Sequence, residues 1–356
     1  MKVYNIEVFN NSMLCIHHEA ISEYEYDFDY LSPVESKLEL NFHNADARFV
    51  RIVSDEQDID VMGVITSLDD GEQMEIGFKP FTTCFDANIL FDTTDQGSAS
   101  LESIIEKYIQ ETFVNSGDTL QNLPIGTITL TSSTTNWGMN LKADTEGTTK
   151  CKINLYDVLI ANSFSNYGIV VEAIPNPTQR VIDITIGKIA SPDTVLEIDA
   201  PGVTIKKFTV RDASAKVNKL IIYRTMENYL WTKTYYLHPD GTYGTENTDR
   251  IFPVVLDIDA VTPSDTSIEK WDEACRQAAV SKFGNMKYDN LIQIEVSPND
   301  PLIKPLDLKI GQIVQVVHNG TAYDTIVSAV KYGDLIELTM GMIRINATKR
   351  FRRLLK

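Results

Sequence analysis

A β-hairpin pattern occurs near both ends of this chain. The segment TIVSAVKYGDLIELTMG, at residues 325–341, has a fainter copy, GVITSLDDGEQMEIGF, at residues 63–78. Both copies contain a serine, then a glycine, then an apolar–Glu–apolar triplet: Ser67, Gly71 and Met74-Glu75-Ile76 in the first, and Ser328, Gly333 and Ile336-Glu337-Leu338 in the second. Short hairpins also recur in unrelated proteins, so the repetition indicates either coincidence or two related β-modules.

Strict alternation predicts further strands around the first hairpin. In SEYEYDFDYLSPVESKLELNF, which begins at Ser22, aromatic residues occupy one face and acidic residues the other: Tyr24, Tyr26, Phe28 and Tyr30 against Glu25, Asp27 and Asp29. Leu38, Leu40 and Phe42 continue the period of two, which is typical of a half-buried strand. More strands are expected at residues 47–54, 59–67 and 73–79.

Three- and four-residue spacing predicts three helices between the ends. The first spans SASLESIIEKYIQETF and ends at Asn115-Ser116-Gly117; the second spans residues 155–166 and ends at Gly168, before strands at 169–174 and 181–188. The third runs from Ser267 to Phe283. It begins with a capping-box pattern and has four residues on one face: Thr266 and Glu269 for the box, and Ile268, Trp271, Cys275 and Ala278 for the face.

The predicted fold class is α+β and multi-domain, with two small antiparallel β-barrels near the two ends and α+β units between them. A chain of 356 residues is long enough for two to four compact units. LIIYRT and LWTKTYYL flank Glu227-Asn228 in a strand-rich stretch, and Asn319-Gly320 is a strong two-residue hairpin signal. The expected domains are a first β-barrel at 1–95, an α+β domain at 96–195, a strand-rich insert at 196–262, and a helix with the second β-barrel and a C-terminal basic segment at 263–356.

Charge is distributed unevenly along the chain. Residues 1–100 hold 20 acidic and 5 basic residues, a net charge of −15, whereas residues 301–356 hold 4 acidic and 9 basic residues, a net charge of +5. The whole chain carries a net charge of −18. Acidic proteins repel nucleic-acid phosphates, so we expect no DNA binding through the backbone, although solubility alone also explains such a balance.

No targeting or membrane segment is expected. Glu7 interrupts the N-terminal stretch where a signal peptide needs an apolar run, and no stretch approaches eighteen consecutive apolar residues. The cysteines are far apart, and none belongs to a zinc-binding spacing: Cys15, Cys84, Cys151 and Cys275. We expect free, mostly buried thiols in a soluble protein made in a reducing cytosol.

Enzyme motifs are missing from the sequence. It contains no GxSxG, HExxH or GxxxxGK[ST], and no GxGxxG after a strand. Three clusters have side chains that could bind a metal ion, the last two of them calcium, but ordinary surface positions explain them better. They are Cys15, His17 and Glu19 on one strand face; Asp55, Glu56, Asp58 and Asp60; and Asp92 and Asp95 with Gly97. We predict no catalytic, cofactor-binding or metal-binding residue, and no enzyme activity.

Aromatic and basic clusters have similar alternatives. The face formed by Tyr24, Tyr26, Phe28 and Tyr30 could stack on sugars, but core packing or a subunit interface fits its alternation better. Trp137, Trp231 and Trp271 are too scattered in sequence to build a sugar platform. The terminal KRFRRLLK has five basic residues among eight and permits nucleic-acid or membrane contact, but a lone helix leading into a further segment is the preferred interpretation.

The element order resembles the tail-hub family of bacteriophages, which comprises baseplate hub proteins and the N-terminal structural part of tail-associated lysins. The resemblance covers most of the chain through loose strand patterns: YDFDYLSPVESKLELNF, GVITSLDDGEQMEIGF, NLYDVLIANSFSNYGIVVEA and IGQIVQVVHNGTAYDTIVSAVKYGDLIELTMGMIRI. It implies a structural homotrimer at the tail tip or baseplate of the virion, made in the host cytoplasm. The trimer would lie beneath a hexameric distal tail protein and contact tape-measure and receptor-binding proteins.

The same resemblance would explain the repeated hairpin. If both hairpins belong to similar barrels, three chains supply six barrels, and a trimer can meet a hexamer without a symmetry clash. DNA would pass an acidic channel wall, or be closed off by it, without specific binding. Two alternatives stay open: a carbohydrate-binding adhesin of the virion, and the hub part of a cell-wall hydrolase whose catalytic domain is absent here.

Overall fold

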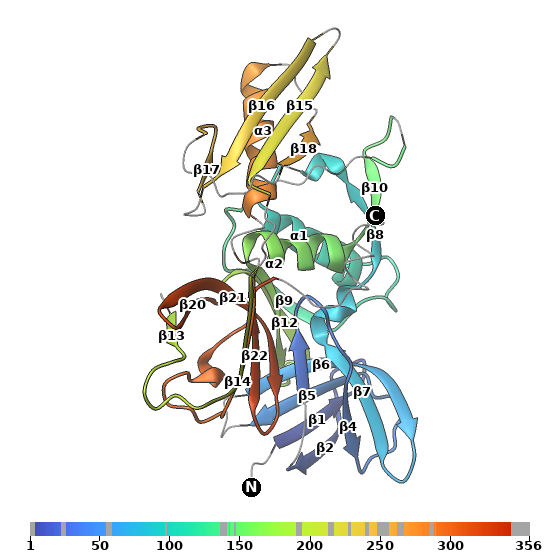
Figure 1. The fold of residues 1–356 in the computed structure, drawn as a ribbon. Helices are drawn as coiled ribbons and strands as arrows, with labels where there is room; N and C mark the ends of the chain where they lie inside the picture. The colour runs from blue at the N-terminus through green and yellow to red at the C-terminus, as the bar shows by residue number, and fades with distance from the viewer. Residues whose placement is uncertain are drawn as a thin grey trace.

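The computed structural model describes residues 4–342 except 23–25, 55–58, 97, 136–140, 142, 146, 190–193, 213–216, 227–228, 239–241, 248–255, 262–266, 285–287 and 289. Two curled sheets lie side by side at one end of the molecule, helices and short sheets form its middle, and a small α+β unit forms the other end (Figure 1). The predicted α+β, multi-domain fold class is confirmed. No helix among the described residues is both long and apolar enough to cross a membrane.

The first sheet is antiparallel, with strand order β2-β1-β5-β6-β7-β4. Its strands are β1 (Tyr4–Phe9), β2 (Cys15–Ile21), β4 (Ser36–Leu40), β5 (Phe49–Ser54), β6 (Ile59–Asp70) and β7 (Met74–Pro80). Alternate residues face a core that the curled sheet encloses, as the period of two predicts. Ile6, Val8, Leu40, Ile76 and Phe78 are among its fully buried side chains.

The second sheet has the order β13-β20-β21-β22-β19-β14, and β3 also pairs with β21. Its strands are β3 (Tyr26–Asp29), β13 (Thr194–Glu197), β14 (Ile205–Asp212), β19 (Asn290–Val296), β20 (Ile313–His318), β21 (Thr321–Tyr332) and β22 (Ile336–Met340). The short helix η5 (Pro305–Asp307) precedes β20. Asn319 and Gly320 have φ values of 49° and 74°, which confirms the predicted two-residue hairpin between β20 and β21.

The middle of the chain contributes helices and two small sheets, β10-β8 and β11-β12-β9. Its elements are η1 (Phe81–Phe85), β8 (Asn88–Asp92), η2 (Thr93–Asp95), α1 (Leu101–Ile109), η3 (Gln110–Val114), β9 (Ile125–Leu130), β10 (Lys150–Asn154), η4 (Leu155–Ala161), α2 (Asn162–Tyr167), β11 (Ile169–Asn176) and β12 (Val181–Lys188). Both predicted helices form, each partly as π-helix, and Gly168 ends the second with φ 69°. The middle shares one continuous core with the second sheet.

The small α+β unit consists of the sheet β17-β16-β15-β18 and helix α3. Its elements are β15 (Lys219–Met226), β16 (Tyr229–Leu237), β17 (Tyr243–Gly244), β18 (Leu256–Ala260) and α3 (Ile268–Gly284). Helix α3 buries Trp271, Cys275, Ala279 and Phe283 against the sheet. Ile268 was expected on that face but is 61% exposed, so the buried face of α3 begins at Trp271.

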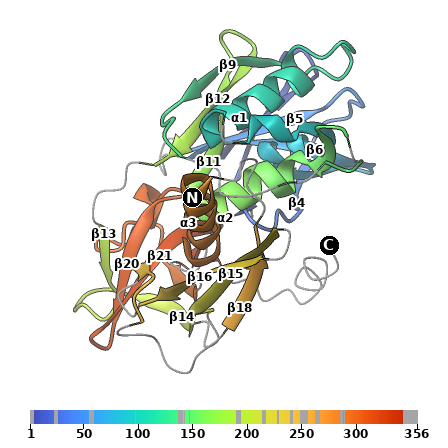
Figure 2. The same ribbon diagram turned by 90° about the horizontal axis from the view of Figure 1, so that it is seen from above.

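Two strands pair differently from the expectation drawn from their position in sequence. β3 lies in the segment expected to build the first barrel, but its partner is β21 of the second sheet. β14 lies in the segment expected as an insert, but it pairs with β19. Figure 2 shows β14, β20 and β21 on the same side of the molecule, away from β5 and β6. Strand pairing therefore links segments that are distant in the sequence.

Candidate functional site

The residues of β2 that were considered for metal binding form hydrogen bonds that stabilise the first sheet. His17 Nε2 lies 3.0 Å from Glu19 Oε2, and Glu19 also accepts hydrogen bonds from Asn41 N and Nδ2 at 2.8 Å each. Burial raises the pKa of Glu19, but these hydrogen bonds outweigh it and leave the pKa below its usual value. Cys15 Sγ contacts its neighbour His17 O at 3.2 Å. Within the described residues, no three His, Cys, Asp or Glu side chains converge as a metal site.

The acidic residues considered for calcium form ion pairs and caps. Asp92 caps Thr94 N at 3.0 Å and pairs with Lys150 Nζ at 2.7 Å, and this ammonium holds the pKa of Asp92 well below its usual range. Asp95 pairs with Lys107 at 2.8 Å. Asp60 pairs with Arg51 at 2.7 Å. Asp55, Glu56, Asp58 and Gly97 lie outside the described residues.

Tyr26 of β3 and Tyr30, just after it, are buried and join the two cores, whereas Phe28 is half-buried. Tyr26 is 0% exposed and stacks on Phe78 of the first sheet, with ring centroids 5.4 Å apart. Tyr30 is 1% exposed, and its Oη accepts a hydrogen bond of 2.7 Å from Val171 N. Of the two preferred interpretations of this face, core packing and a subunit interface, core packing is therefore confirmed for Tyr26 and Tyr30. Tyr24 lies outside the described residues.

Two of the three tryptophans come together around one arginine, which sequence reasoning missed. Trp231 and Trp271 are 6.3 Å apart between ring centroids, and the Arg224 guanidinium lies over them at 4.4 Å and 5.2 Å. Arg224 and Trp231 are direct partners in the β15–β16 ladder, so the register of that hairpin contains the signal. Arg224 is 6% exposed, so the cluster packs the small unit together. Trp137 and the terminal KRFRRLLK lie outside the described residues.

The thiols are free, as predicted, but differ in burial. Cys151 and Cys275 are buried, Cys84 is half-buried and Cys15 is exposed. Burial raises the pKa of the Cys275 thiol to about 11, against a smaller opposing effect from Lys233. A thiol with a raised pKa is a poor nucleophile, so this residue has a packing role.

The feature that repeats is the four-stranded module around each hairpin. We name β4-β5-β6-β7 the first module and β19-β20-β21-β22 the second module. In both, the strands occur in the spatial order second, third, fourth, first along the chain, and every neighbouring pair is antiparallel. The two modules therefore have the same topology.

The hairpins of the two modules also agree residue by residue. β6 and β21 are both 12 residues long and begin 262 residues apart (321 minus 59). With this shift, the pairs Ile65↔Phe78 and Leu68↔Ile76 correspond to Val327↔Met340 and Val330↔Leu338. Gly71 corresponds to Gly333 in the turn, as the sequence comparison predicts.

A β-bulge occurs at the same position of each hairpin. The register shifts between Ile65 and Ser67 in β6, and between Val327 and Ala329 in β21. The bulged residues, Thr66 and Ser328, each donate a hydroxyl hydrogen bond to the facing carbonyl: Thr66 Oγ1 to Gly77 O at 3.2 Å, and Ser328 Oγ to Thr339 O at 3.1 Å. The sequence alignment of Ser67 with Ser328 is thus wrong by one residue, because the bulge position defines the match.

The first strands of the modules correspond as well. Leu38 and Glu39 face Ile76 and Glu75, as Ile294 and Glu295 face Leu338 and Glu337. Lys37 contacts Glu75 at 2.5 Å, and its counterpart Gln293 contacts Glu337 at 3.2 Å. Topology, register, bulge and side-chain contacts agree, so the repetition noticed in the sequence is a structural duplication.

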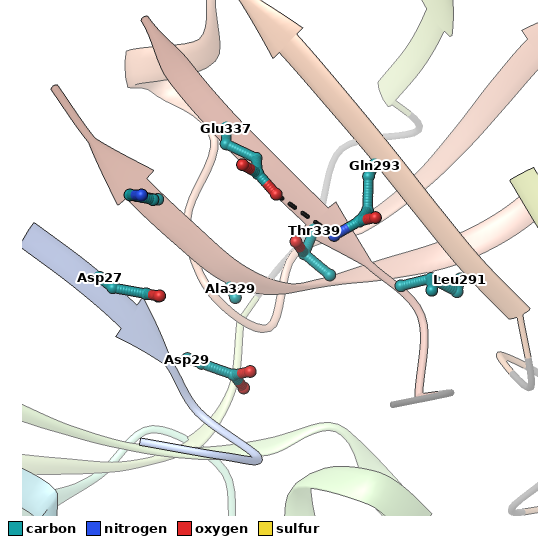
Figure 3. A pocket seen from close by; sticks show the side chains of 8 residues that line it. Asp27, Asp29, Leu291, Gln293, Ala329, Glu337 and Thr339 are labelled. Carbon is teal, nitrogen blue, oxygen red and sulfur yellow. Dashed lines mark hydrogen bonds between the residues drawn. The ribbon is translucent and has the colours of Figure 1, made fainter. Parts of the chain in front are cut away.

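The outer face of the second module carries a shallow groove (Figure 3). It is lined by Asp27, Asp29, Leu291, Gln293, Ala329, Lys331, Glu337 and Thr339. Asp29 Oδ1 already accepts hydrogen bonds from Leu31 N and Ser32 N, both at 2.9 Å, and so fixes the turn after β3. The lining mixes charged side chains with the apolar side chains of Leu291 and Ala329, and Gln293 Nε2 donates a hydrogen bond of 3.2 Å to Glu337 Oε1.

The known proteins that resemble this chain are found through its fold. No family model and no curated protein matches the sequence. Its fold is similar to that of the 43 kDa tail protein of prophage MuSo2 from Shewanella oneidensis, with a TM-score of 0.52, 9% identity, and coverage of 95% of this chain and 98% of that one. The predicted resemblance to phage tail proteins is confirmed at the level of the fold.

Two further solved structures are similar to this chain with TM-scores below 0.5. The prophage tail protein gp18 from Listeria monocytogenes EGD-e has a TM-score of 0.47 and 12% identity, covering 100% of this chain and 98% of that one. A chain of the phage P2 baseplate in its activated conformation with Ca has a TM-score of 0.48 and 11% identity, covering 96% and 98%.

Proposed function

We propose that this protein is a structural hub of a phage or prophage tail tip or baseplate. In this proposal it forms a homotrimer under a hexameric distal tail ring and lines or closes the DNA channel of the virion. It acts by assembly, without catalysis. The domain division 1–95, 96–195, 196–262 and 263–356 belongs to the same proposal.

The duplication of the module is the observation that carries the proposal. Three chains with two modules each supply six similar modules, and six similar modules can contact six ring subunits in nearly the same way. A chain with a single module would give a trimer three contacts, and half of the ring would have no counterpart. The shared fold with a prophage tail protein over 95% of this chain supports the same function.

The carbohydrate-binding alternative loses its main support. Stacking on a sugar needs exposed aromatic faces, whereas Tyr26 and Tyr30 are 0% and 1% exposed. The hydrolase alternative would place its catalytic groups outside this chain. We therefore expect no turnover of purified peptidoglycan.

Two measurements test the hub. Light scattering on the purified protein should give the mass of a trimer, and electron microscopy of the protein mixed with a hexameric distal tail protein should show one trimer per ring. A protein that stays monomeric both alone and with the ring would contradict the proposal. Binding to cell-wall glycan with a monomeric mass would favour the adhesin instead.

A further inference from the structure

Comparison of the two modules exposes an unused strand edge. In the second module the distal half of β21 pairs with β22 on one side and with β3 on the other: Ala329↔Asp29, Val330↔Phe28, Lys331↔Asp27 and Tyr332↔Tyr26. The equivalent half of β6, residues 67–70, pairs with β7 on one side. No strand of the described residues occupies its other side. Open backbone edges of this kind are sites for strand addition.

A second open edge belongs to β14. This strand ends the second sheet, with β19 on one side and no strand of the described chain on the other. β14 is also the counterpart of β3. Strand β3 comes directly before the first module in the chain, and β14 is the strand of the second sheet that comes before the second module. The small α+β unit is inserted between β14 and β19. β14 and the β6–β7 hairpin lie on opposite sides of the molecule (Figures 1 and 2), so one chain cannot join them.

We propose that β14 of one copy pairs antiparallel with residues 67–70 of β6 in the next copy. β14 then does between chains what β3 does within a chain. This inference rests on the proposed trimer and names the surfaces that build it. Strand directions are consistent, because β3 is antiparallel to β21, β14 is antiparallel to β19, and neighbours alternate throughout both modules.

A row of charges across the sheet fixes the register. A row of five charged residues crosses the second sheet, with one residue on each of five neighbouring strands. Each residue faces the next across a strand pair, in the order Asp27 (β3), Lys331 (β21), Glu337 (β22), Glu295 (β19) and Lys207 (β14). The corresponding row of the first module holds three carboxylates, of which Glu75 is paired with Lys37: Asp69, Glu75 and Glu39. Like charges that face each other across strands are destabilising. Lys207, which is exposed, continues the row favourably if it lies opposite Asp69.

The same register matches the apolar side chains. It places Phe208 of β14 opposite Leu68 of β6, as Phe28 of β3 stands opposite Val330 of β21. Leu68 is half-buried and packs at the margin of the first core, and Phe208 packs against His318 with ring centroids 4.4 Å apart. Lys206 then lies opposite Asp70, a second pair of opposite charge. The contact is head-to-tail, so it forms a ring only where the rotation from chain to chain closes, and three chains is the closure that the proposed trimer requires.

Cysteine cross-linking tests the register directly. Facing residues of antiparallel strands have Cα atoms about 4.5–5.5 Å apart, within the range of a disulfide. Asp69→Cys with Lys207→Cys, in a Cys15→Ser background that removes the exposed native thiol, should give covalent trimers under mild oxidation. The matched control is Glu111→Cys with Lys207→Cys, because Glu111 is exposed and lies on η3, outside both modules. It should give none.

Charge reversal tests the interface without a covalent bond. Asp69→Lys and Lys207→Asp should each raise the trimer dissociation constant by roughly tenfold or more, and the double variant should recover most of the loss. Circular dichroism and thermal unfolding of each variant separate a weakened interface from a misfolded chain.

The outcomes separate the interface from the hub itself. Covalent trimers and rescue by the double variant support both. A trimer by mass that neither cross-links nor responds to charge reversal overturns this interface and leaves the proposed function standing. Monomers that persist both alone and with the distal tail ring, without cross-links, overturn both. Covalent rings of another size contradict closure at three.

Discussion

Glu102 shows how one buried carboxylate holds the middle of the chain. It is 0% exposed at the start of α1, and its Oε1 accepts hydrogen bonds from Thr135 Oγ1 at 2.7 Å and Ser132 Oγ at 2.8 Å. Burial raises the pKa of Glu102, but hydrogen bonds from its own backbone N–H, Thr135 and Ser132 together lower it by more. The pKa therefore lies below the usual 4.5. The ionised form therefore stabilises the fold.

We predict that Glu102→Gln lowers the free energy of unfolding at pH 7 by about 1.5–3 kcal/mol, the usual worth of hydrogen bonds to a charged group. Because the folded pKa is lowered, this contribution is complete above pH 4.5 and is lost as the pH falls through the folded pKa. Urea unfolding across a pH series should show the difference between the two proteins shrinking in acid. A difference that is constant with pH would contradict the assignment, and the exposed control Glu111→Gln should show none.

The bulge hydroxyls offer a matched pair of substitutions. Ser328 is 0% exposed, and its hydroxyl contacts Thr339 O and also Gly341 O, the latter at 2.7 Å. We predict that Ser328→Ala costs about 1–2 kcal/mol, because buried carbonyls lose their partner. Thr66 is exposed, and water can replace its hydroxyl at both Gly77 O and Glu35 Oε2, so Thr66→Ala should change stability by less than about 0.5 kcal/mol. Equal losses in urea unfolding would show that burial does not govern the bulge.

At the scale of elements, helix α2 ends through a glycine. Gly168 has φ 69°, and its N–H donates to Phe164 O at 2.9 Å. We predict that Gly168→Ala lowers the free energy of unfolding by about 1 kcal/mol, since an L-residue is strained in this conformation although space for a methyl group exists. Gly117→Ala is the control: its surroundings are open and its φ is not positive, so it should be neutral or slightly stabilising in the same urea titration.

Strand β3 is the element that connects the two cores. It pairs with β21 of the second module, while Tyr26 stacks on Phe78 of the first sheet and on Tyr332 of the second. The modules are thus fastened by a backbone ladder and by aromatic packing at once. Such a junction holds the two modules of a chain together, as the proposed ring of six modules would require.

At the scale of the whole molecule, charge governs contact with DNA. The chain has a net charge of −18, and binding to DNA depends on basic residues that neutralise phosphates. We predict that fluorescence anisotropy detects no binding of duplex DNA at physiological salt. Binding that strengthens as salt is lowered would contradict the proposal that DNA passes the protein without adhering to it.

The sequence by itself determined where many strands and helices lie, although some ends differ: β6 was expected to end at residue 67 and ends at Asp70. Alternation and helical spacing record which side of a segment is buried, and this is a local property of neighbouring residues. The strands of both hairpins, helices α1 and α2, the Asn319-Gly320 turn and the Gly168 cap therefore followed from sequence. The alternation of β3 also predicted that its aromatic residues share one face and its acidic residues the other. It did not predict which residues the aromatic face contacts.

Only the tertiary structure decided how strands that are distant in the sequence pair. Backbone hydrogen-bonding groups are the same in every strand, so sequence does not state that β3 joins β21 or that β14 joins β19. The same reason explains the alignment error at Ser67. A bulge shifts the register by one residue, and only the ladder of hydrogen-bonded pairs shows that Thr66 is the counterpart of Ser328. Pairing is settled by packing between distant segments, which no local pattern contains.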